Sequence, residues 1–372
     1  MDAMLKRKIF SKTLDAMAIC STIITFSCVF SKIKKIKSPQ SEFGILAAKS
    51  IFPRQTNYTK FHFGSNLFEN LKNNNNKSTE KSEPTTPDLS SNRSTEFLEP
   101  ENQTVFRGEG PTHRIIESQI GSGGTKCQNF YVKNSTDQDI NFETELGVNP
   151  EISIKQTNEP QVLIFHTHTS ESYMYEDSGF FYENFYPRSL ENAKNVTAVG
   201  QVITDKLIER GINTIHDKTC HDNPSYNGSY SRSAQTIKKN LDQYPSIQVV
   251  IDIHRDSLGT TDTGKIKPTF KYDNKKAAQI MIISGCDSDG RLGFPNWRKN
   301  LRFALRVQKY AESMFPGITR PLRFAKVKYN EHLTPGSLLI EVGSDMNTLE
   351  EAKRTGLMLG EILAKLLNDL KK

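Results

Sequence analysis

The chain has few cysteines and no marked excess of charge of one sign. Its five cysteines are scattered over 372 residues, and no two form a C-x-x-C pair, which excludes a disulfide framework and a cysteine-based metal or redox motif. The 49 basic residues are nearly matched by 42 acidic ones, so the composition does not indicate nucleic acid as a partner. The net charge of +7 suits contact with an anionic polymer or a membrane surface.

Apolar residues are also scarce. The hydrophobic content of 35% and the mean hydropathy of -0.56 are low for a wholly globular protein. Residues 71–102 consist mainly of Asn, Ser, Thr, Glu, Lys and Pro, and such a segment cannot bury enough apolar area to offset the entropy lost on ordering. We therefore expect residues 36–103 to form an extracytoplasmic linker that is largely disordered.

One mainly apolar run, residues 14–30, follows the basic residues Lys6, Arg7, Lys8 and Lys12. The pattern is typical of a signal peptide or a membrane anchor. No Ala-x-Ala-like cleavage site follows the run, and lysines stand there instead. We therefore expect residues 1–35 to form an uncleaved single-pass anchor in the cell membrane, which places the rest of the chain outside the cytoplasm.

From residue 161 onward, short apolar runs alternate with segments of helical period. This alternation predicts an α/β domain over residues 161–372, with a mostly parallel open sheet flanked by helices. Residues 104–160 are expected to form an N-terminal extension of that domain, with short strands at 128–132 and 152–155. The strands expected in the domain are 162–165, 212–215, 249–253, 278–283 and 338–341, and the helices are 196–208, 231–241, 300–314 and 349–370.

Ionisable side chains directly follow several of these strands. His168 and Glu171 come after strand 162–165, His254 follows strand 249–253, and Glu341 ends strand 338–341. Ligands of open parallel α/β sheets bind beyond the carboxyl ends of the strands, so these side chains are expected to meet there.

Two histidines and a glutamate can hold a hydrolytic zinc ion. His168, Glu171 and His254 supply this set, and His166 is an alternative to His168 because the two alternate along an extended backbone. Glu341 ends a core strand, where desolvation raises the pKa of a carboxyl and suits it to act as a general base.

Other polar residues lie near the predicted site. Arg255, Arg232 and Asn330 are candidates for binding an anionic or amide substrate, although each residue type is more often structural. Asp252 stands between Ile251 and Ile253 and can pair with a basic group within the sheet.

Four segments, in this order, resemble the stage II sporulation protein P family of zinc-dependent N-acetylmuramoyl-L-alanine amidases. The segments are VLIFHTHTSESY (162–173), PSYNGSYSRS (224–233), VIDIHRD (250–256) and LLIEVGSDMNTLEE (338–351).

The resemblance implies roles for single residues. It selects His168 over His166 as the first zinc histidine, makes His254 the second, and matches Glu341 and the downstream Asn347 to a catalytic motif. In the wider amidase group the ligand glutamate begins the first crossover helix, near Glu191 here. The sporulation branch points to Glu171 instead, and we expect Glu171 to be the ligand.

The resemblance also implies a function. It implies zinc-dependent cleavage of the amide between the lactyl group of N-acetylmuramic acid and the L-alanine of the stem peptide, with peptide cross-link cleavage as a further activity. The expected partners are peptidoglycan and stage II sporulation proteins D and M, during remodelling of the septal wall in engulfment. The alternatives are a wall-binding module without catalysis and a different zinc hydrolase.

Overall fold

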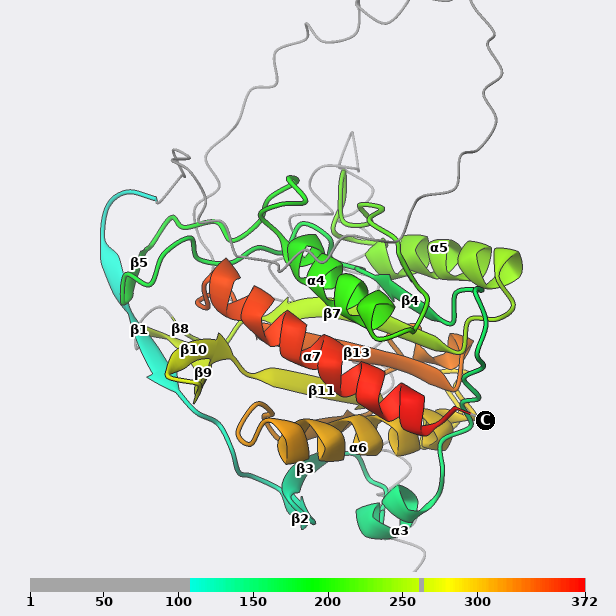
Figure 1. Cartoon of the computed structure of the whole chain (residues 1–372). Coiled ribbons are helices and arrows are strands. Elements are labelled where there is room, and N and C mark those ends of the chain that lie inside the picture. Colours follow the sequence, from blue (N-terminus) through cyan, green and yellow to red (C-terminus); the bar gives the residue numbers. More distant parts are fainter. Residues whose placement is uncertain (1–107, 261–263, 372) are drawn as a thin grey trace, which may run out of the picture. The chain divides into compact units, whose positions relative to one another are not determined.

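The core of the fold is an eight-stranded sheet (Figure 1). In spatial order its strands are β2 (Thr125–Cys127), β3 (Phe130–Ser135), β12 (Leu322–Ala325), β11 (Ile280–Gly285), β13 (Gly336–Ser344), β7 (Val249–Asp256), β4 (Val162–Phe165) and β6 (Thr214–His216). The computed structural model describes residues 108–260 and 264–371, all within one compact unit, residues 96–372.

The predicted anchor and linker lie outside the described residues. Among residues 108–260 and 264–371, no helix has the length and apolar character needed to cross a membrane.

Seven of the eight strands form two parallel blocks, and β2 pairs with β3 in antiparallel register. Strands β13, β7, β4 and β6 run in one direction. Strands β11, β12 and β3 are parallel to one another but antiparallel to the first block, because β11 pairs with β13 in antiparallel register. The predicted α/β fold with flanking helices is therefore confirmed, and the sheet is mixed.

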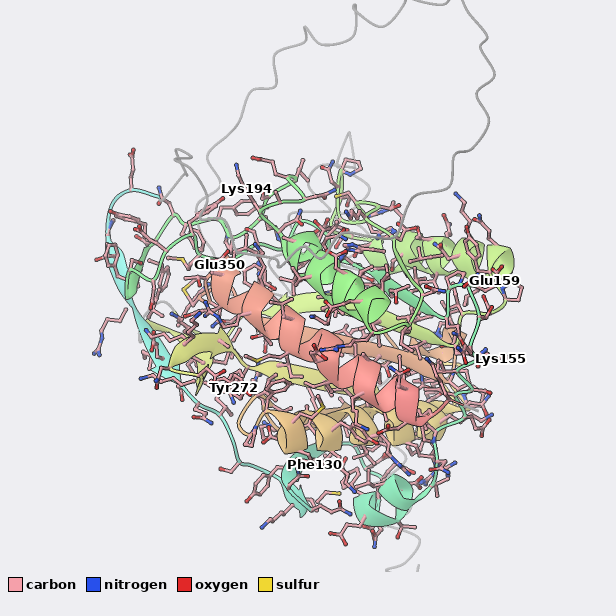
Figure 2. All side chains as sticks on the ribbon, in the orientation of Figure 1. Phe130, Lys155, Glu159, Lys194, Tyr272 and Glu350 are labelled. Carbon is pink, nitrogen blue, oxygen red and sulfur yellow. The ribbon has the colours of Figure 1, made fainter. Side chains whose placement is uncertain are left out.

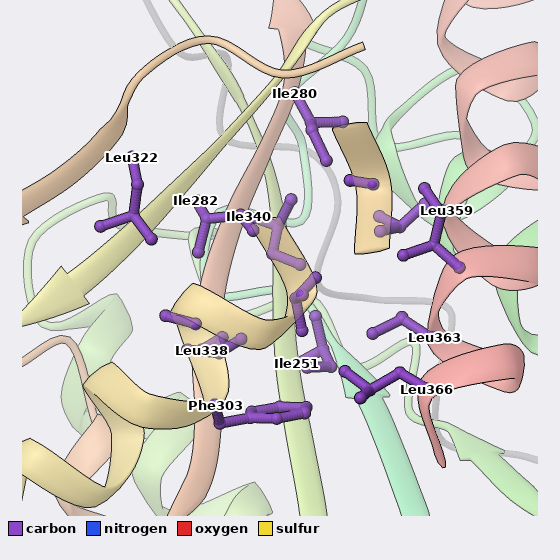
Figure 3. Close-up of a cluster of buried hydrophobic side chains, with 14 of the residues drawn as sticks. Ile251, Ile280, Ile282, Phe303, Leu322, Leu338, Ile340, Leu359, Leu363 and Leu366 are labelled. Atoms are coloured by element: carbon purple, nitrogen blue, oxygen red, sulfur yellow. The ribbon is translucent and has the colours of Figure 1, made fainter. Parts of the chain in front are cut away.

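Three helices cover one face of the sheet, as Figure 1 shows: α4 (Val196–Glu209), α6 (Trp297–Met314) and α7 (Leu349–Asp369). Their apolar residues pack against alternate residues of the strands, and Figure 3 shows Leu359, Leu363 and Leu366 of α7 facing Ile251 and Ile340. Full burial of one such side chain stabilises the fold by about 1.5–3 kcal/mol. This face of the sheet therefore holds the main core.

Helix α5 (Ser229–Gln243) packs on the opposite face, against β4 and β7. Ile237 of α5 contacts Leu163, Phe165 and Val250 there. The side chains at the ends of these strands on this face therefore lie beside the start of α5.

Local sequence explains where the helices begin and end. Thr348 accepts a hydrogen bond from the backbone N–H of Glu351, and the Glu351 carboxylate accepts one from Thr348 N–H, so α7 begins with a capping box. Asn195 caps α4 by accepting from Thr197 N–H. Gly211, with a φ of +76°, follows the end of α4.

A second, smaller sheet was not predicted from the sequence. It contains β10 (Lys275–Ala278), β9 (Gly264–Tyr272), β1 (Thr112–Ser118) and β5 (Phe180–Tyr182), and β8 (Gly259–Thr260) pairs with β9. The N-terminal extension thus supplies strands to both sheets: β1 to this one, and β2 and β3 to the main one. The strand expected at 128–132 is β3, shifted to Phe130–Ser135, whereas 152–155 forms only an isolated bridge at Ile154.

A fully buried lysine joins the second sheet to α7. The Nζ atom of Lys267 lies 2.6 Å from Asp177, 2.8 Å from Glu351 and 3.1 Å from Glu117. These three carboxylates are close enough together to hold a cation, and the lysine ammonium takes that position.

Other charged side chains lie on the surface of the protein. Figure 2 labels Lys155, Glu159 and Glu350 there, all exposed, whereas Phe130 at the start of β3 is buried. Two short helices complete the described chain, α3 (Phe142–Gly147) and the 3-10 helix η1 (Glu331–Leu333).

Candidate active site

The ends of β4, β7 and β13 bring four of the predicted residues together. His168 and Glu171 lie in the loop after β4, His254 lies near the end of β7, and Glu341 lies on β13. His168, Glu171 and His254 are buried, with 7%, 6% and 3% of their surface exposed. The crevice beyond the strand ends therefore holds a compact, desolvated group of imidazoles and carboxylates.

Glu171 lies between the two histidines. Its Oε1 is 3.5 Å from His168 Nδ1, and its Oε2 is 3.2 Å from His254 Nδ1. The two imidazole rings are 5.1 Å apart between centroids. Burial alone disfavours ionised Glu171, but its contacts with His168 and His254 hold its pKa well below 4.5, so it is a carboxylate.

These three residues fit a zinc ion. Imidazole nitrogen and carboxylate oxygen are preferred zinc ligands, and atoms that surround zinc at about 2 Å lie roughly 3–3.5 Å from one another. The separations of Glu171 from His168 and from His254 fall in that range, and one ligand atom from each of the three residues lies within 4.8 Å of the others. His168 also has a buried Nε2 without a hydrogen-bond partner among the described residues.

Asp252 supports His254 from the side away from Glu171. Its Oδ1 is 2.9 Å from His254 Nε2, although the two atoms do not form a well-aligned hydrogen bond. The Asp252 carboxylate is held by Thr167, which donates its backbone N–H at 2.8 Å and its hydroxyl at 2.6 Å. A carboxylate behind a metal-binding imidazole fixes the ring and raises its basicity.

Glu341 stands directly beside His254. The two residues are register partners on β13 and β7, so their side chains leave the same face of the sheet. Glu341 is partly buried, and its Oε2 is shielded from solvent without a hydrogen-bond partner among the described residues. Burial raises the pKa of Glu341 to about 8, with His254 opposing the shift and Asp256 and Glu171 adding to it.

The two alternative ligands lie elsewhere. His166 points to the opposite face, where its Nδ1 meets the Ile253 carbonyl at 2.9 Å and its Nε2 meets His216 at 2.9 Å. Glu191 has an exposed side chain that pairs with Lys194 at 2.7 Å. The cluster therefore contains His168 and Glu171 and neither of these two residues.

The two arginines predicted to bind substrate are engaged with backbone carbonyls. Arg255 donates to the carbonyls of Ser172 at 3.0 Å and Pro187 at 2.8 Å. Arg232 donates to the carbonyls of His221, Ser225 and Asn227. This geometry favours a role in positioning the loops around the site over direct contact with substrate.

The two asparagines noted in the sequence also make structural contacts. Asn330 donates to the Tyr230 carbonyl at 2.8 Å. Asn347 accepts from Ser344 N–H at 2.9 Å and donates to Glu351 at 3.0 Å. Asn347 thus fixes the turn that follows Glu341.

A groove beside His168 was not predicted from the sequence. Tyr226 stacks on the His168 ring at 4.3 Å, and Arg188 lies over the Tyr226 ring at 5.1 Å while pairing with Asp222 at 2.8 Å. Tyr226, Arg188, Asp222 and Tyr186 line a cavity of about 350 Å³ beside His168. The tyrosines of segment 224–233 were the only sequence signal for it.

The fold and the site define an α/β protein with a buried His–Glu–His cluster and an adjacent glutamate at the strand ends. The family model described as "Stage II sporulation protein P (SpoIIP)" matches residues 47–364, and the chain belongs to this family. This finding confirms the resemblance seen in the sequence.

A curated relative, the stage II sporulation protein P of Bacillus subtilis (strain 168), is 29% identical over 223 residues, which are 57% of this chain and 52% of the relative. The chain thus matches about half the length of that protein.

Solved structures similar to this chain include two N-acetylmuramoyl-L-alanine amidases. One is from Clostridium difficile 630, with a TM-score of 0.33 and 17% identity over 57% of this chain and 97% of that chain. The other is the catalytic domain of an amidase from Bacillus (Paenibacillus) polymyxa var. colistinus, with a TM-score of 0.34 and 14% identity over 56% of this chain and 97% of that chain.

Proposed function

We propose that the protein is a zinc-dependent N-acetylmuramoyl-L-alanine amidase that hydrolyses septal peptidoglycan during sporulation. The observation that supports this most strongly is the placement of Glu341 beside the buried cluster of His168, Glu171 and His254. Membership of the sporulation protein P family supports the biological setting. The bond cleaved is the amide between the lactyl group of the muramic acid and the L-alanine of the stem peptide.

His168, Glu171 and His254 would hold the zinc ion. Zinc, when bound, supplies a Lewis acid that polarises a carbonyl and lowers the pKa of a coordinated water. Asp252 and Thr167 keep His254 in place for this role, because they fix the ring from behind.

Glu341 is assigned as the general base. It removes a proton from the attacking water as the water oxygen bonds to the scissile carbonyl carbon. It then donates that proton to the leaving nitrogen as the carbon–nitrogen bond breaks, so the products are a lactyl carboxylate and a free L-alanine amine. The raised pKa of the Glu341 carboxyl suits both transfers, because a group that titrates near the working pH accepts and returns a proton readily.

The remaining parts of the proposal concern location and partners. The predicted anchor at residues 1–35 and the linker at 36–103 would hold the enzyme at the mother-cell membrane while letting it search the wall. Stage II sporulation proteins D and M are the proposed partners, and cross-link cleavage is proposed as an additional activity.

The test uses the full-length chain in detergent or membrane vesicles with purified peptidoglycan. Release of free stem peptides that stops with a chelator and returns with added zinc supports the amidase. Binding to the wall with no products under any metal condition would point to a binding module, and release of acetate or single amino acids would point to another hydrolase.

A further inference from the structure

Two cationic side chains lie side by side at the far edge of the main sheet. Lys133 of β3 and Arg323 of β12 are register partners on parallel strands. Both are exposed, and neither forms a hydrogen bond or ion pair with any residue in the described part of the chain. Like charges placed directly opposite each other on neighbouring strands destabilise a sheet, so the fold itself does not account for this pair.

The pair projects from the same face of the sheet as Glu341. Met281 of β11 is the register partner of Glu341. Ile283, two residues later on β11, points the same way as Met281 and is the register partner of Arg323. The register therefore places Glu341, Arg323 and Lys133 on one face, in order across four strands.

A groove lies along this face. It has a volume of about 560 Å³ and is lined by Lys133, Arg323, Arg320, Asp256, Met281 and Gly123, among others. Arg320 is buried and pairs with Asp256 at 2.9 Å, so the charges of these two residues cancel. Lys133 and Arg323 leave the groove with two uncompensated positive charges.

We infer that Lys133 and Arg323 form a subsite for the C-terminal carboxylate of the stem peptide, an inference that rests on the amidase activity proposed above. The lactyl carboxyl of the substrate is neutral because it is part of the scissile amide, whereas the free C-terminus of the stem peptide supplies a carboxylate. Carboxylates bonded by cationic donors form the stronger class of hydrogen bonds. The groove is thus assigned to the peptide side of the substrate.

The spacing fits a stem of about four residues. Neighbouring strands are about 4.8 Å apart, so Arg323 and Lys133 lie two and three strands from Glu341. They also lie about 7 Å along the strand direction, because Arg323 is opposite Ile283 and Glu341 is opposite Met281, which gives separations of roughly 12–16 Å. An extended peptide spans about 3.3–3.6 Å per residue. About four residues therefore separate the scissile amide at Glu341 from a carboxylate at the pair, and a stem whose end is consumed in a cross-link lacks that carboxylate.

The test measures binding, not hydrolysis. Fluorescence anisotropy of the full-length chain is recorded with a tetrapeptide that begins with L-alanine, carries a dye at its N-terminus and ends in a carboxylate or a carboxamide. The unmodified protein should prefer the carboxylate about tenfold, as expected for a charge-assisted contact. Lys133→Ser with Arg323→Ser should remove this preference and leave carboxamide binding unchanged.

Matched variants sharpen the test. Lys239→Ser removes an exposed lysine on α5, away from the groove, and should keep the preference, as should the charge-conserving Lys133→Arg. Three results would overturn the subsite. They are equal binding of the two peptides, an unchanged preference in the double variant, and binding of inorganic phosphate as strong as that of the carboxylate peptide. The binding assay needs no cleavage. A protein that keeps the carboxylate preference but does not cleave peptidoglycan would therefore refute the proposed amidase activity and not the subsite.

Discussion

Glu341 and His254 occupy opposite positions on the neighbouring strands β13 and β7, and their side chains share one face of the sheet. His254 also contacts Glu171 at 3.2 Å, so the proposed base is one strand, about 4.8 Å, from the proposed metal cluster. A water molecule between them would be within reach of both. The parallel register of β13 and β7 thus sets the distance between the proposed base and the proposed metal site.

Glu341→Gln removes the proposed base but keeps the size of the side chain. We expect hydrolysis of peptidoglycan to fall about 10²–10⁴-fold, the usual contribution of general base catalysis. Zinc content should stay the same, because Glu341 is not among the three clustered residues. Turnover and metal content measured on the same sample check both statements, and full activity in this variant would remove Glu341 from the mechanism.

His168→Ala and His254→Ala should each lower zinc content, because each removes one of the three clustered ligands. His166→Ala should retain zinc, since His166 faces the opposite side of the sheet and contacts His216. It should still lower the free energy of unfolding by about 1–3 kcal/mol, because it leaves the polar partners of a buried side chain unpaired.

The glutamates offer a matched pair for the same measurement. Glu171→Gln should reduce zinc content, whereas Glu191→Gln, at an exposed side chain, should not. Metal analysis of the dialysed proteins decides between them, and zinc loss only in the Glu191 variant would reverse the ligand assignment.

Zinc binding should weaken as the pH falls. Burial opposes the charged form of His254, but the carboxylates of Asp252 and Glu171 outweigh the effect of burial and raise the pKa of His254 well above 6.5. The metal-free protein therefore carries a proton on His254 at neutral pH, and zinc must displace it. Calorimetry of zinc binding in buffers of different ionisation enthalpy should detect about one released proton at pH 7. Zinc affinity that does not change between pH 6 and 8 would contradict this.

Lys267→Met should destabilise the protein strongly. The lysine is fully buried among three carboxylates, and removing one partner of such a group costs about 3–5 kcal/mol. Lys276 contacts two of the same carboxylates, Glu117 and Asp177, from a more exposed position. Lys276→Met should therefore lower the free energy of unfolding by less than about 1 kcal/mol. Equal losses of unfolding free energy in the two variants, measured by urea denaturation, would show that burial does not decide how much each lysine contributes.

The main sheet was predictable where its strands are continuously apolar. Strands β4, β7 and β13 carry runs such as Val162 to Phe165, which are typical of strands buried on both faces. The second sheet was not predictable in this way, because β9 contains three lysines and a proline and β1 alternates without a clear apolar face. Its burial depends on Lys267 meeting carboxylates distant in sequence.

The candidate site was partly predictable for a related reason. The polar residues at the strand ends stand out from their apolar neighbours, so local pattern alone could find His254 and Glu341. It left His166 as an alternative to His168, and the family resemblance was needed to choose between them. The engagement of Arg255 and Arg232 with backbone carbonyls depends on loop conformation. The Asp252 contact to His254 does follow from strand alternation, because the two residues are two apart on β7. The contacts of the two arginines are therefore the part of the site that residue spacing does not predict.

The most direct test of the central claim is hydrolysis of purified peptidoglycan by the zinc-loaded full-length protein in water enriched in oxygen-18, followed by mass spectrometry of the products. The account predicts one heavy oxygen in the lactyl carboxylate of muramic acid and an unlabelled stem peptide with a free L-alanine amine. Label in released acetate or in a peptide carboxylate, with the lactyl group still amidated, would contradict it.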